Sequence, residues 1–274
     1  MSSHTNLFGA MSEVDIEARL GRLRWQNVAL GVLHLGQAIA VWALNETKFA
    51  LPVTGTYPTN APGLEPPSLQ DPALWSIDVG LWVFAFLAIS AVAHFTIASP
   101  WYFPRYAADI RNGKNSARWV EYSISSSVMI IVIAAITGIV DIAAFIAIFG
   151  ANAAMILFGE IQERYEKPGG SLLPFWFGTT IGLVPWVAIG MYLFGVGSAT
   201  TDLSLVPSFV WVIFFSLFAF FFSFGLNQWL QYKRIGKWAN YFHGETTYIV
   251  LSLVAKSLLA WLLFANVLVM PNVG

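Results

Sequence analysis

The chain has 274 residues, of which 57% are hydrophobic and only 11% carry a formal charge, and its net charge is −1. Soluble domains have roughly 25% charged residues, so this composition cannot cover a surface that faces water and indicates an integral membrane protein. The net charge near zero argues against a nucleic-acid partner. The sequence contains no cysteine, which excludes disulfides and thiolate metal sites, and no glycine-rich phosphate loop of the dinucleotide-binding or P-loop kind.

The predicted elements are seven membrane-spanning helices, each long and apolar enough for the roughly 20 residues that a bilayer requires. We predict these spans over residues 25–44, 74–98, 119–138, 142–158, 172–194, 207–230 and 246–270. Residues 123–159 contain a single formal charge, Asp141, and would form a helix about 55 Å long, so we expect the chain to reverse between Gly138 and Asp141. The expected fold is an all-α membrane protein with one seven-helix domain over residues 1–274.

The segments before and after the first span have different characters. Ser12 and Asp15 have the spacing of a capped helix start, so we expect a helix to begin there and to lead into the span. The connection over residues 45–73 contains six prolines and is expected to be a long loop and not a helix.

The basic residues predict the orientation of the chain. Twelve of the fourteen fall before the first span or in the connections that follow the second, fourth and sixth spans, whereas the opposite connections contain only Lys48. Under the positive-inside rule the N-terminus is cytoplasmic, and the C-terminus and the 45–73 loop are extracellular. We therefore expect a multi-pass protein of the cell membrane.

The fourteenth basic residue, Lys256, lies inside the seventh span, about 15 Å from its cytoplasmic end. A lysine at such a depth costs at least about 2.5 to 3.5 kcal/mol on insertion scales and is normally functional. Three interpretations compete: a lysine in an ion or proton relay, a lysine whose neutral amine forms a Schiff base, and a structural lysine paired across the bundle.

Glu121 is the expected partner of Lys256, because a buried cation needs a buried anion and Glu121 is the carboxylate within the apolar part of the third span. Ser125 lies one helical turn after Glu121, and Ser252 lies one turn before Lys256, where it can donate to the carboxylate. The alternative for Glu121 is an interfacial pair with Arg118 at i−3.

Two histidines, His34 and His94, are predicted in the cytoplasmic half of the first and second spans, near the depth of this pair. A lone histidine on an apolar face is more often a satisfied core residue, but two at this depth could hold a proton that leaves the pair. They do not suggest zinc, because no third ligand is evident, and we predict no metal site. His4 and His243 lie outside the spans and are expected in water.

Aromatic and small residues give weaker indications. Trp176, Trp186 and Trp261 are candidates for lining a flat hydrophobic ligand, although most rings of so aromatic a chain should face lipid or pack between helices. Gly178 and Gly182 form a GxxxG motif, which we interpret as close helix packing and, with less weight, as a dimer surface.

The sequence resembles the heliorhodopsin family. The resemblance rests on RWVEYSISSSVM at residues 118–129 and SLVAKS at 252–257, with further matching stretches FGANAAMILFG at 149–159, LPFWFG at 173–178 and YIVL at 248–251. It extends over nearly the whole chain, and the orientation deduced from the basic residues is also that of this family.

The resemblance implies a site for all-trans retinal. Lys256 would carry the chromophore as a protonated Schiff base and Glu121 would be its counterion, assisted by Ser252 and Ser125. The other residues implied are His34 and His94 in a polar cavity beside the Schiff base, Asn152, Met155, Trp176 and Trp261 in contact with the chromophore, and Tyr122 and Gln37 in supporting positions.

The implied function is that of a photoreceptor and not of an enzyme. Light would isomerise retinal, the Schiff base proton would move toward the region of Glu121, His34 and His94, and a slow photocycle would prolong a sensory or regulatory state without ion pumping. The resemblance also implies a homodimer in the lipid bilayer, and the sequence does not name the signalling partner.

Two other functions compete with this one. Light-driven proton pumps of the bacteriorhodopsin kind have a second carboxylate about eleven residues after the first on the third helix, where this chain has Val132. The sequence therefore disfavours a pump, but it is compatible with a passive light-gated proton path. The third possibility is a transporter or structural membrane protein without retinal.

Overall fold

The computed structural model describes residues 7–45, 48–60, 63, 68–195 and 202–268. His4, Pro62, Pro66 and Pro67, and positions 269–270 at the end of the seventh predicted span, lie outside the described residues.

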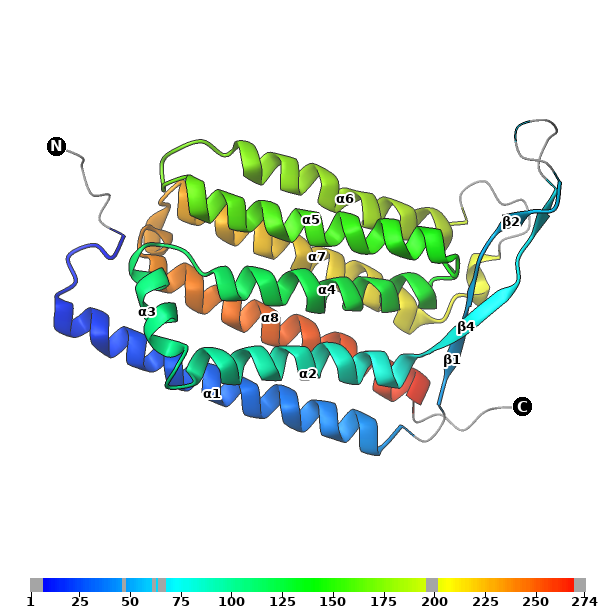
Figure 1. Cartoon of the computed structure of the whole chain (residues 1–274), viewed down its shortest axis with the longest axis horizontal. Helices are drawn as coiled ribbons and strands as arrows, with labels where there is room; N and C mark the ends of the chain where they lie inside the picture. Colours follow the sequence, from blue (N-terminus) through cyan, green and yellow to red (C-terminus); the bar gives the residue numbers. More distant parts are fainter. Residues whose placement is uncertain (1–6, 46–47, 61–62, 64–67, 196–201, 269–274) are drawn as a thin grey trace.

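Seven helices of 20 or more residues run side by side in the described part of the chain (Figure 1). They are α1 (Glu13–Ala43), α2 (Val79–Ala98), α4 (Ser116–Ile136), α5 (Ile142–Tyr165), α6 (Leu173–Leu193), α7 (Ser208–Tyr232) and α8 (Tyr241–Leu263), which continues as a π-helical turn over Phe264–Leu268. Six of them, α2 and α4 to α8, are long and apolar enough to cross a membrane within the described residues. The remaining one, α1, has 31 residues and is therefore about 46 Å long, and its first turns carry charged side chains.

The start of α1 confirms the predicted helix cap. Ser12 Oγ accepts a hydrogen bond from the backbone N–H of Asp15 at 3.2 Å, and the Asp15 carboxylate accepts one from the Ser12 N–H at 3.3 Å. This reciprocal pair satisfies two N–H groups that the first helical turn leaves without partners. Helix α1 therefore begins well before its apolar segment.

The predicted reversal between the third and fourth spans is also confirmed. Helix α4 ends at Ile136, and Gly138 follows with a φ of +99°. Glycine adopts this conformation with little steric strain because it has no Cβ atom. The N–H of Gly138 donates to the Ala135 carbonyl and that of Ile139 to the Ala134 carbonyl, which is the Schellman ending of a helix. Asp141 then caps α5 by accepting from the N–H groups of Ala143 and Ala144.

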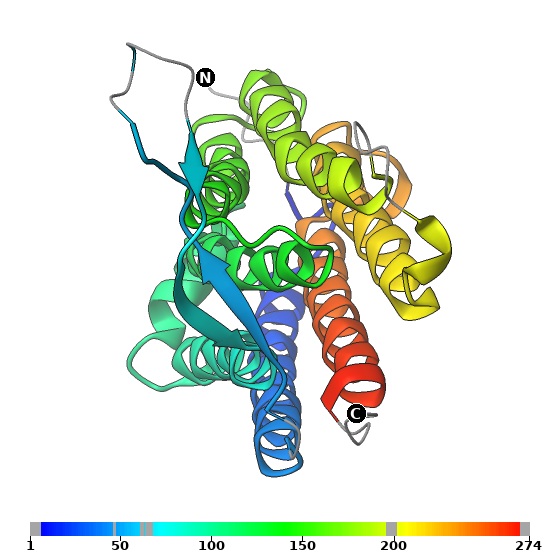
Figure 2. The same cartoon turned by 90° about the vertical axis from the view of Figure 1, so that its right-hand side faces the viewer.

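The connection between α1 and α2 is not helical, as predicted, but it contains an antiparallel β-ribbon that the sequence analysis did not foresee. Strand β1 (Ala50–Thr54) pairs with β4 (Ala73–Asp78), and β2 (Tyr57–Pro58) pairs with β3 (Leu69–Gln70). Figure 2 shows the ribbon lying across one end of the bundle. The Thr54 N–H donates to the Val140 carbonyl at 2.8 Å, and the Thr56 N–H donates to Asp141 Oδ2 at 3.1 Å. The ribbon is thus attached to the turn between α4 and α5.

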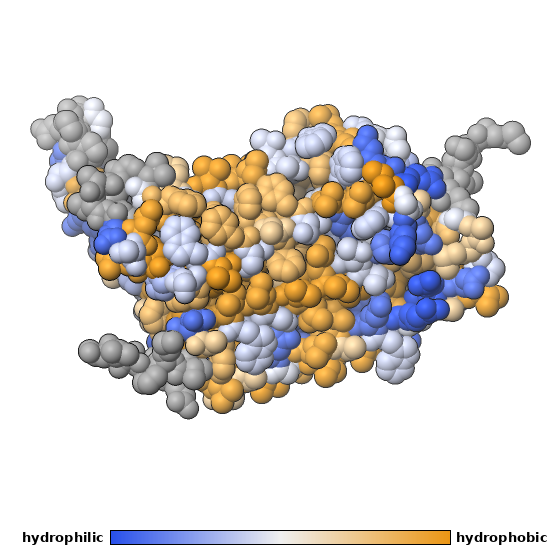
Figure 3. Space-filling model, turned by 180° about the vertical axis from the view of Figure 1, so that it is seen from behind, coloured by the Kyte–Doolittle hydropathy of each residue, from blue (hydrophilic) through white to orange (hydrophobic). Residues whose placement is uncertain are grey.

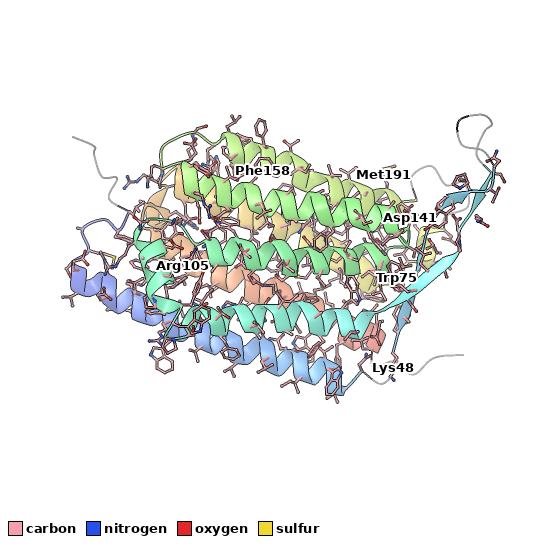
Figure 4. All side chains as sticks on the ribbon, viewed as in Figure 1. Lys48, Trp75, Arg105, Asp141, Phe158 and Met191 are labelled. Atoms are coloured by element: carbon pink, nitrogen blue, oxygen red, sulfur yellow. The ribbon has the colours of Figure 1, made fainter. Side chains whose placement is uncertain are left out.

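Short elements lie in other connections. Helix α3 (Phe103–Arg111), also not predicted, follows α2, and the 3₁₀ turns are η1 (Leu203–Leu205) and η2 (Gly236–Ala239). Arg111 of α3 pairs with Glu13 at 2.9 Å and with Glu17, which holds α3 against the start of α1. Figure 4 places Arg105 of α3 at one end of the molecule and Lys48, Trp75 and Asp141 near the other.

The described helices enclose α4, which is the most buried of the six apolar helices. Its second half contributes Met129 to Ala135 to a continuous apolar core that also includes residues of β1, β4 and every other long helix. The outer surfaces of the helices are apolar as well, and Figure 3 shows hydrophobic residues over the middle of one face with strongly hydrophilic residues gathered mainly toward one end. A surface of this kind suits lipid and not water.

Candidate functional site

The structure brings Lys256 of α8 and Glu121 of α4 together inside the bundle. Lys256 Nζ donates to Glu121 Oε1 at 2.7 Å, and their side chains are only 4% and 6% exposed. Transfer of either charge alone from water into this interior would be strongly unfavourable, so the two side chains depend on each other. The pairing is the one predicted from the sequence, and the alternative pair of Glu121 with Arg118 is wrong, since Arg118 has other partners.

Glu121 has a second hydrogen-bond donor that the sequence analysis missed. Ser90 Oγ of α2 donates to the same oxygen, Oε1, at 2.6 Å. The expected assistants, Ser125 and Ser252, are buried close by, but neither hydroxyl has a hydrogen-bond partner among the described residues. Ser90 could have been noticed because it lies one helical turn before His94, on the same face of α2.

His34 and His94 lie beside each other, as expected from their similar depth. Their rings are stacked with centroids 5.5 Å apart and planes 8° apart. His94 Nδ1 is 2.8 Å from Asn27 Oδ1, which requires the proton on Nδ1. Both nitrogens of His34 and Nε2 of His94 are buried without a partner in the described part of the chain. These atoms leave unused hydrogen-bonding capacity near the Lys256–Glu121 pair.

A cavity of about 670 Å³ adjoins Lys256. Aromatic and aliphatic side chains of α4 to α8 dominate its wall, and the predicted residues that line it are Tyr122, Ser125, Asn152, Met155, Trp176, Trp186, Ser252 and Lys256. The Tyr122 ring lies 5.1 Å from Lys256 Nζ, and its hydroxyl donates to the Tyr248 carbonyl at 3.0 Å. Asn152 Nδ2 donates to the hydroxyls of Ser126 and Ser127 at 2.8 and 3.0 Å. The cavity therefore has a few ordered polar groups in an apolar wall, as small-molecule sites commonly do.

Two residues expected at the ligand do not line this cavity. Trp261 is 42% exposed on the outside of the bundle, where it contacts Phe264. It follows Lys256 by five residues, which turns it about 140° around α8 at 3.6 residues per turn. Gln37 of α1 is also absent from the wall. His243, expected in water, is half-buried and packs edge-to-face on Trp238.

The GxxxG motif packs within the chain. A side chain at Gly178 would meet Phe158 of α5, which Figure 4 labels, at 2.9 Å, and one at Gly182 would collide with Met155 of α5 and meet Phe221 of α7 at 2.7 Å. Both glycines are buried. The interpretation as helix packing is confirmed, and the motif is not a free surface for a second copy.

A second buried ionic cluster joins the two helices that carry Glu121 and Lys256 to α5, and it was not predicted from the sequence. Arg118 of α4 pairs with Glu245 of α8 and, at 2.5 Å, with Glu163 of α5, and all three side chains are at most 3% exposed. Glu245, Ser252 and Lys256 follow one another at helical spacing on one face of α8. This helical spacing was the sequence pattern from which the inward position of Glu245 could have been predicted.

These features define a class of protein: a membrane-helix bundle with a lysine–carboxylate pair on the wall of a large apolar cavity. The model of the Heliorhodopsin family matches residues 23–268, and the chain belongs to that family. Its fold is similar to the crystal structure of cyanorhodopsin from the cyanobacterium Tolypothrix sp. NIES-4075, with a TM-score of 0.57 and 13% identity over 94% of this chain and 96% of that one. The comparison with curated proteins found no match.

Family and fold make this a multi-pass integral membrane protein of the retinal photoreceptor type. The site suits such a group on three counts. The cavity is large, its wall is apolar, and the amine at its edge faces a carboxylate. An aldehyde needs an amine to bond to, and the resulting cation needs an anion in an interior of low polarity.

Proposed function

We propose that the protein is a light sensor in which all-trans retinal is bound to Lys256 as a protonated Schiff base, with Glu121 as counterion. The observation that carries this proposal is the 2.7 Å contact between Lys256 Nζ and Glu121 Oε1 at the edge of the 670 Å³ cavity. Trp176, Trp186, Met155 and Asn152 would hold the chromophore from α5 and α6, because they line that cavity.

The chain's own residues would act on one proton. Retinal, when bound, supplies absorption of visible light and a change of shape. In the dark, the ionised Glu121 keeps the proton on Lys256 Nζ, and Ser90 stabilises the carboxylate. A proton released from Lys256 Nζ would have Glu121, His34 and His94 as its acceptors. The unpartnered nitrogens of the two histidines supply acceptor capacity there. Slow return of the proton would prolong the signalling state.

The test is formation of a pigment. The full chain expressed with all-trans retinal should absorb visible light and bleach with hydroxylamine, whereas Lys256→Ala should stay colourless and Lys48→Ala, at the far end of the molecule, should not. A colourless wild type, or equal pigment in Lys256→Ala, contradicts the proposal.

We further propose that all seven long helices span the membrane with the N-terminus in the cytoplasm. The arrangement of the bundle supports this, because α3 and the start of α1 share one end and Lys48 lies at the other. The chain has no cysteine, so single cysteines report cleanly on sidedness. In intact cells an impermeant maleimide should label Lys48→Cys and should not label Lys233→Cys. The reverse pattern would show the opposite orientation.

We propose sensing without ion pumping, with a light-gated proton path as the alternative. The half of the bundle next to the ribbon is filled by apolar side chains, among them Val132 at the place where pumps carry a second carboxylate. Illuminated cells should show no sustained pH change that an uncoupler abolishes. A sustained change would mean transport.

Assembly belongs to the same proposal. We propose a homodimer in the bilayer, which would transmit the signal to a partner of unknown chemistry. Cross-linking of purified protein in lipid nanodiscs of two sizes should trap a dimer in the larger discs. Monomers alone in discs of both sizes would refute the homodimer.

A further inference from the structure

The cluster formed by Arg118, Glu163 and Glu245 contains two carboxylates and one cation. Two basic side chains near this end have other partners: Lys114 pairs with Asp109 at 3.3 Å, and Arg164 pairs with Glu160 at 2.6 Å. Within the described residues, Arg118 is the one cation paired with either carboxylate. With both carboxylates ionised, the cluster would hold a net negative charge in a buried site.

Two buried carboxylates that share one cation do not readily ionise together, and the pair titrates as a unit. Glu163 has the better set of donors: Arg118, the Asn115 N–H at 3.0 Å and Trp119 Nε1 at 2.7 Å. Glu245 accepts from Arg118, from Asn115 Nδ2 at 2.6 Å and, at a long 3.4 Å, from the hydroxyl of Tyr106. Both carboxylates nevertheless depend on the same guanidinium, and neither is paired with a second cation among the described residues.

The groups that face the cluster from the surrounding helices add no positive charge. They are Tyr106 from α3, Trp119 from α4, and Tyr241 and Tyr248 from α8, and Arg118 lies over the Tyr248 ring at 4.0 Å. The rings shield the cluster from water, and no second cation pairs with either carboxylate among the described residues.

A small cavity connects this cluster to the Lys256–Glu121 pair. Its volume is about 20 Å³, which holds one water molecule. The polar residues on its wall are Asn27, His94, Asn115, Arg118, Glu121, Tyr122 and Glu245. Two buried polar atoms of these residues, Arg118 Nε and His94 Nε2, have no partner among the described residues. Glu121 and Glu245 both line this cavity, so a water molecule held there would lie between the two carboxylates.

We propose that Glu163 and Glu245 share a single proton in the resting protein and form the cytoplasmic terminus of a proton network that begins at Glu121. The shared proton stands on the geometry alone. Its response to light rests on the function proposed above, so the experiment has one arm for each.

The first arm needs no chromophore. Infrared spectra of the protein in the dark, wild type minus Glu245→Gln, should contain the carbonyl stretch of a protonated carboxylic acid, which shifts in D₂O. Glu163→Gln should remove the same band, because either substitution leaves one carboxylate with Arg118. Glu17→Gln, an exposed carboxylate that also pairs with an arginine, should not. Persistence of the band in both cluster variants, or its absence from the wild type, overturns the shared proton.

Melting temperatures provide a second test of the shared proton if a variant is too poorly folded for the infrared comparison. Glu245→Gln leaves a neutral one-to-one pair and should melt at or above the wild-type temperature, whereas Arg118→Gln should melt well below it. A drop for Glu245→Gln as large as that for Arg118→Gln would mean that both carboxylates are ionised, which overturns the proposal.

The second arm uses the pigment. Light-minus-dark infrared spectra should show a change in the same carbonyl band in the wild type and none in Glu245→Gln. An unchanged band in a functional pigment overturns the link to Glu121 and leaves the first arm standing. Failure to form any pigment refutes the proposed function instead, and the dark spectra still decide whether the proton is there.

Discussion

Ser90 and Lys256 donate to the same oxygen of Glu121 from two different helices, α2 and α8, at 2.6 and 2.7 Å. The Glu121 carboxylate therefore accepts hydrogen bonds from a neutral hydroxyl and from the lysine cation. Both donors stabilise the negative charge on Oε1. Hydrogen bonds to a charged group are worth about 1.5 to 3 kcal/mol. This arrangement makes Ser90 a determinant of how strongly Glu121 interacts with Lys256.

Ser90→Ala should shift the visible absorption of the pigment to the blue, because Glu121 without this donor interacts more strongly with the cation at Lys256. The loss of the bond should also destabilise the protein by about 1.5 to 3 kcal/mol. Absorption spectra and thermal melts measure both effects. Ser216→Ala is the matched control, since that hydroxyl bonds to its own helix at Val212. Equal spectra for wild type and Ser90→Ala would show that the contact does not tune the pigment.

Glu121→Gln should shift the absorption to the red and lower the melting temperature. The substitution leaves a buried cation without its anion, and such a loss typically costs about 3 to 5 kcal/mol. Glu121→Asp keeps the charge and should recover part of both properties. If Glu121→Gln keeps the wild-type spectrum, another residue is the counterion.

Gly182→Ala should impair binding of the chromophore. The added methyl group would collide with Met155 and would approach Phe221, and both side chains line the cavity. Overpacking of this kind costs about 1 to 3 kcal/mol. Pigment yield on addition of retinal measures the effect. Gly190→Ala on the same helix is the control, because its new methyl group would make only ordinary contacts, the nearest at 3.7 Å to Phe214. Equal yields for the two variants would contradict the assignment of this cavity.

Acid should loosen the attachment of the ribbon through Asp141. Partial burial raises the pKa of this carboxyl, but the hydrogen bonds from the N–H groups of Ala144, Thr56 and Ala143 outweigh that effect and lower its pKa below the ordinary 3.8. The stabilisation is thus fully present above pH 3.8 and is lost as the pH falls through the lowered value. Asp141→Ala should cost about 0.5 to 2 kcal/mol at neutral pH, as for other helix caps.

Amide hydrogen exchange at Thr54 and Thr56 measures this attachment. Exchange should accelerate in Asp141→Ala at neutral pH and in the wild type only in acid, whereas Asp71→Ala, in the exposed part of the ribbon, should leave it unchanged. Protection that is insensitive to both acid and the substitution would mean that Asp141 does not hold the ribbon.

The features that could be predicted from the sequence are those that depend on helix length and on the free-energy cost of burying a charge. The reversal at Gly138 to Asp141 followed from the length of an uncharged run, and the pair of Lys256 with Glu121 followed from the need of a buried cation for an anion. The ribbon was not predicted, because Pro52 and Pro58 argue against strands, and a two-stranded ribbon tolerates them only because each strand has a free edge.

Which side chains face the cavity depends on how each helix is rotated about its own axis. A helix that is apolar on all sides gives no sequence pattern for this rotation. Trp261 was expected at the cavity but faces outward, since both faces of α8 are hydrophobic and their pattern does not mark the interior. The pairing of Arg118 with Glu163 and Glu245 was missed for a related reason, because both carboxylates lie near helix ends and look like surface residues in the sequence.

Helix α4 is fastened at both ends. At its beginning, Arg118 forms ion pairs with side chains of α5 and α8. After its end at Ile136, Val140 and Asp141 accept hydrogen bonds from the ribbon. A helix held in this way cannot slide along its axis like a piston without breaking one set of bonds. We therefore expect a disturbance at Glu121 to leave α4 sideways, into α2 and α8, whose Ser90 and Lys256 hold its carboxylate.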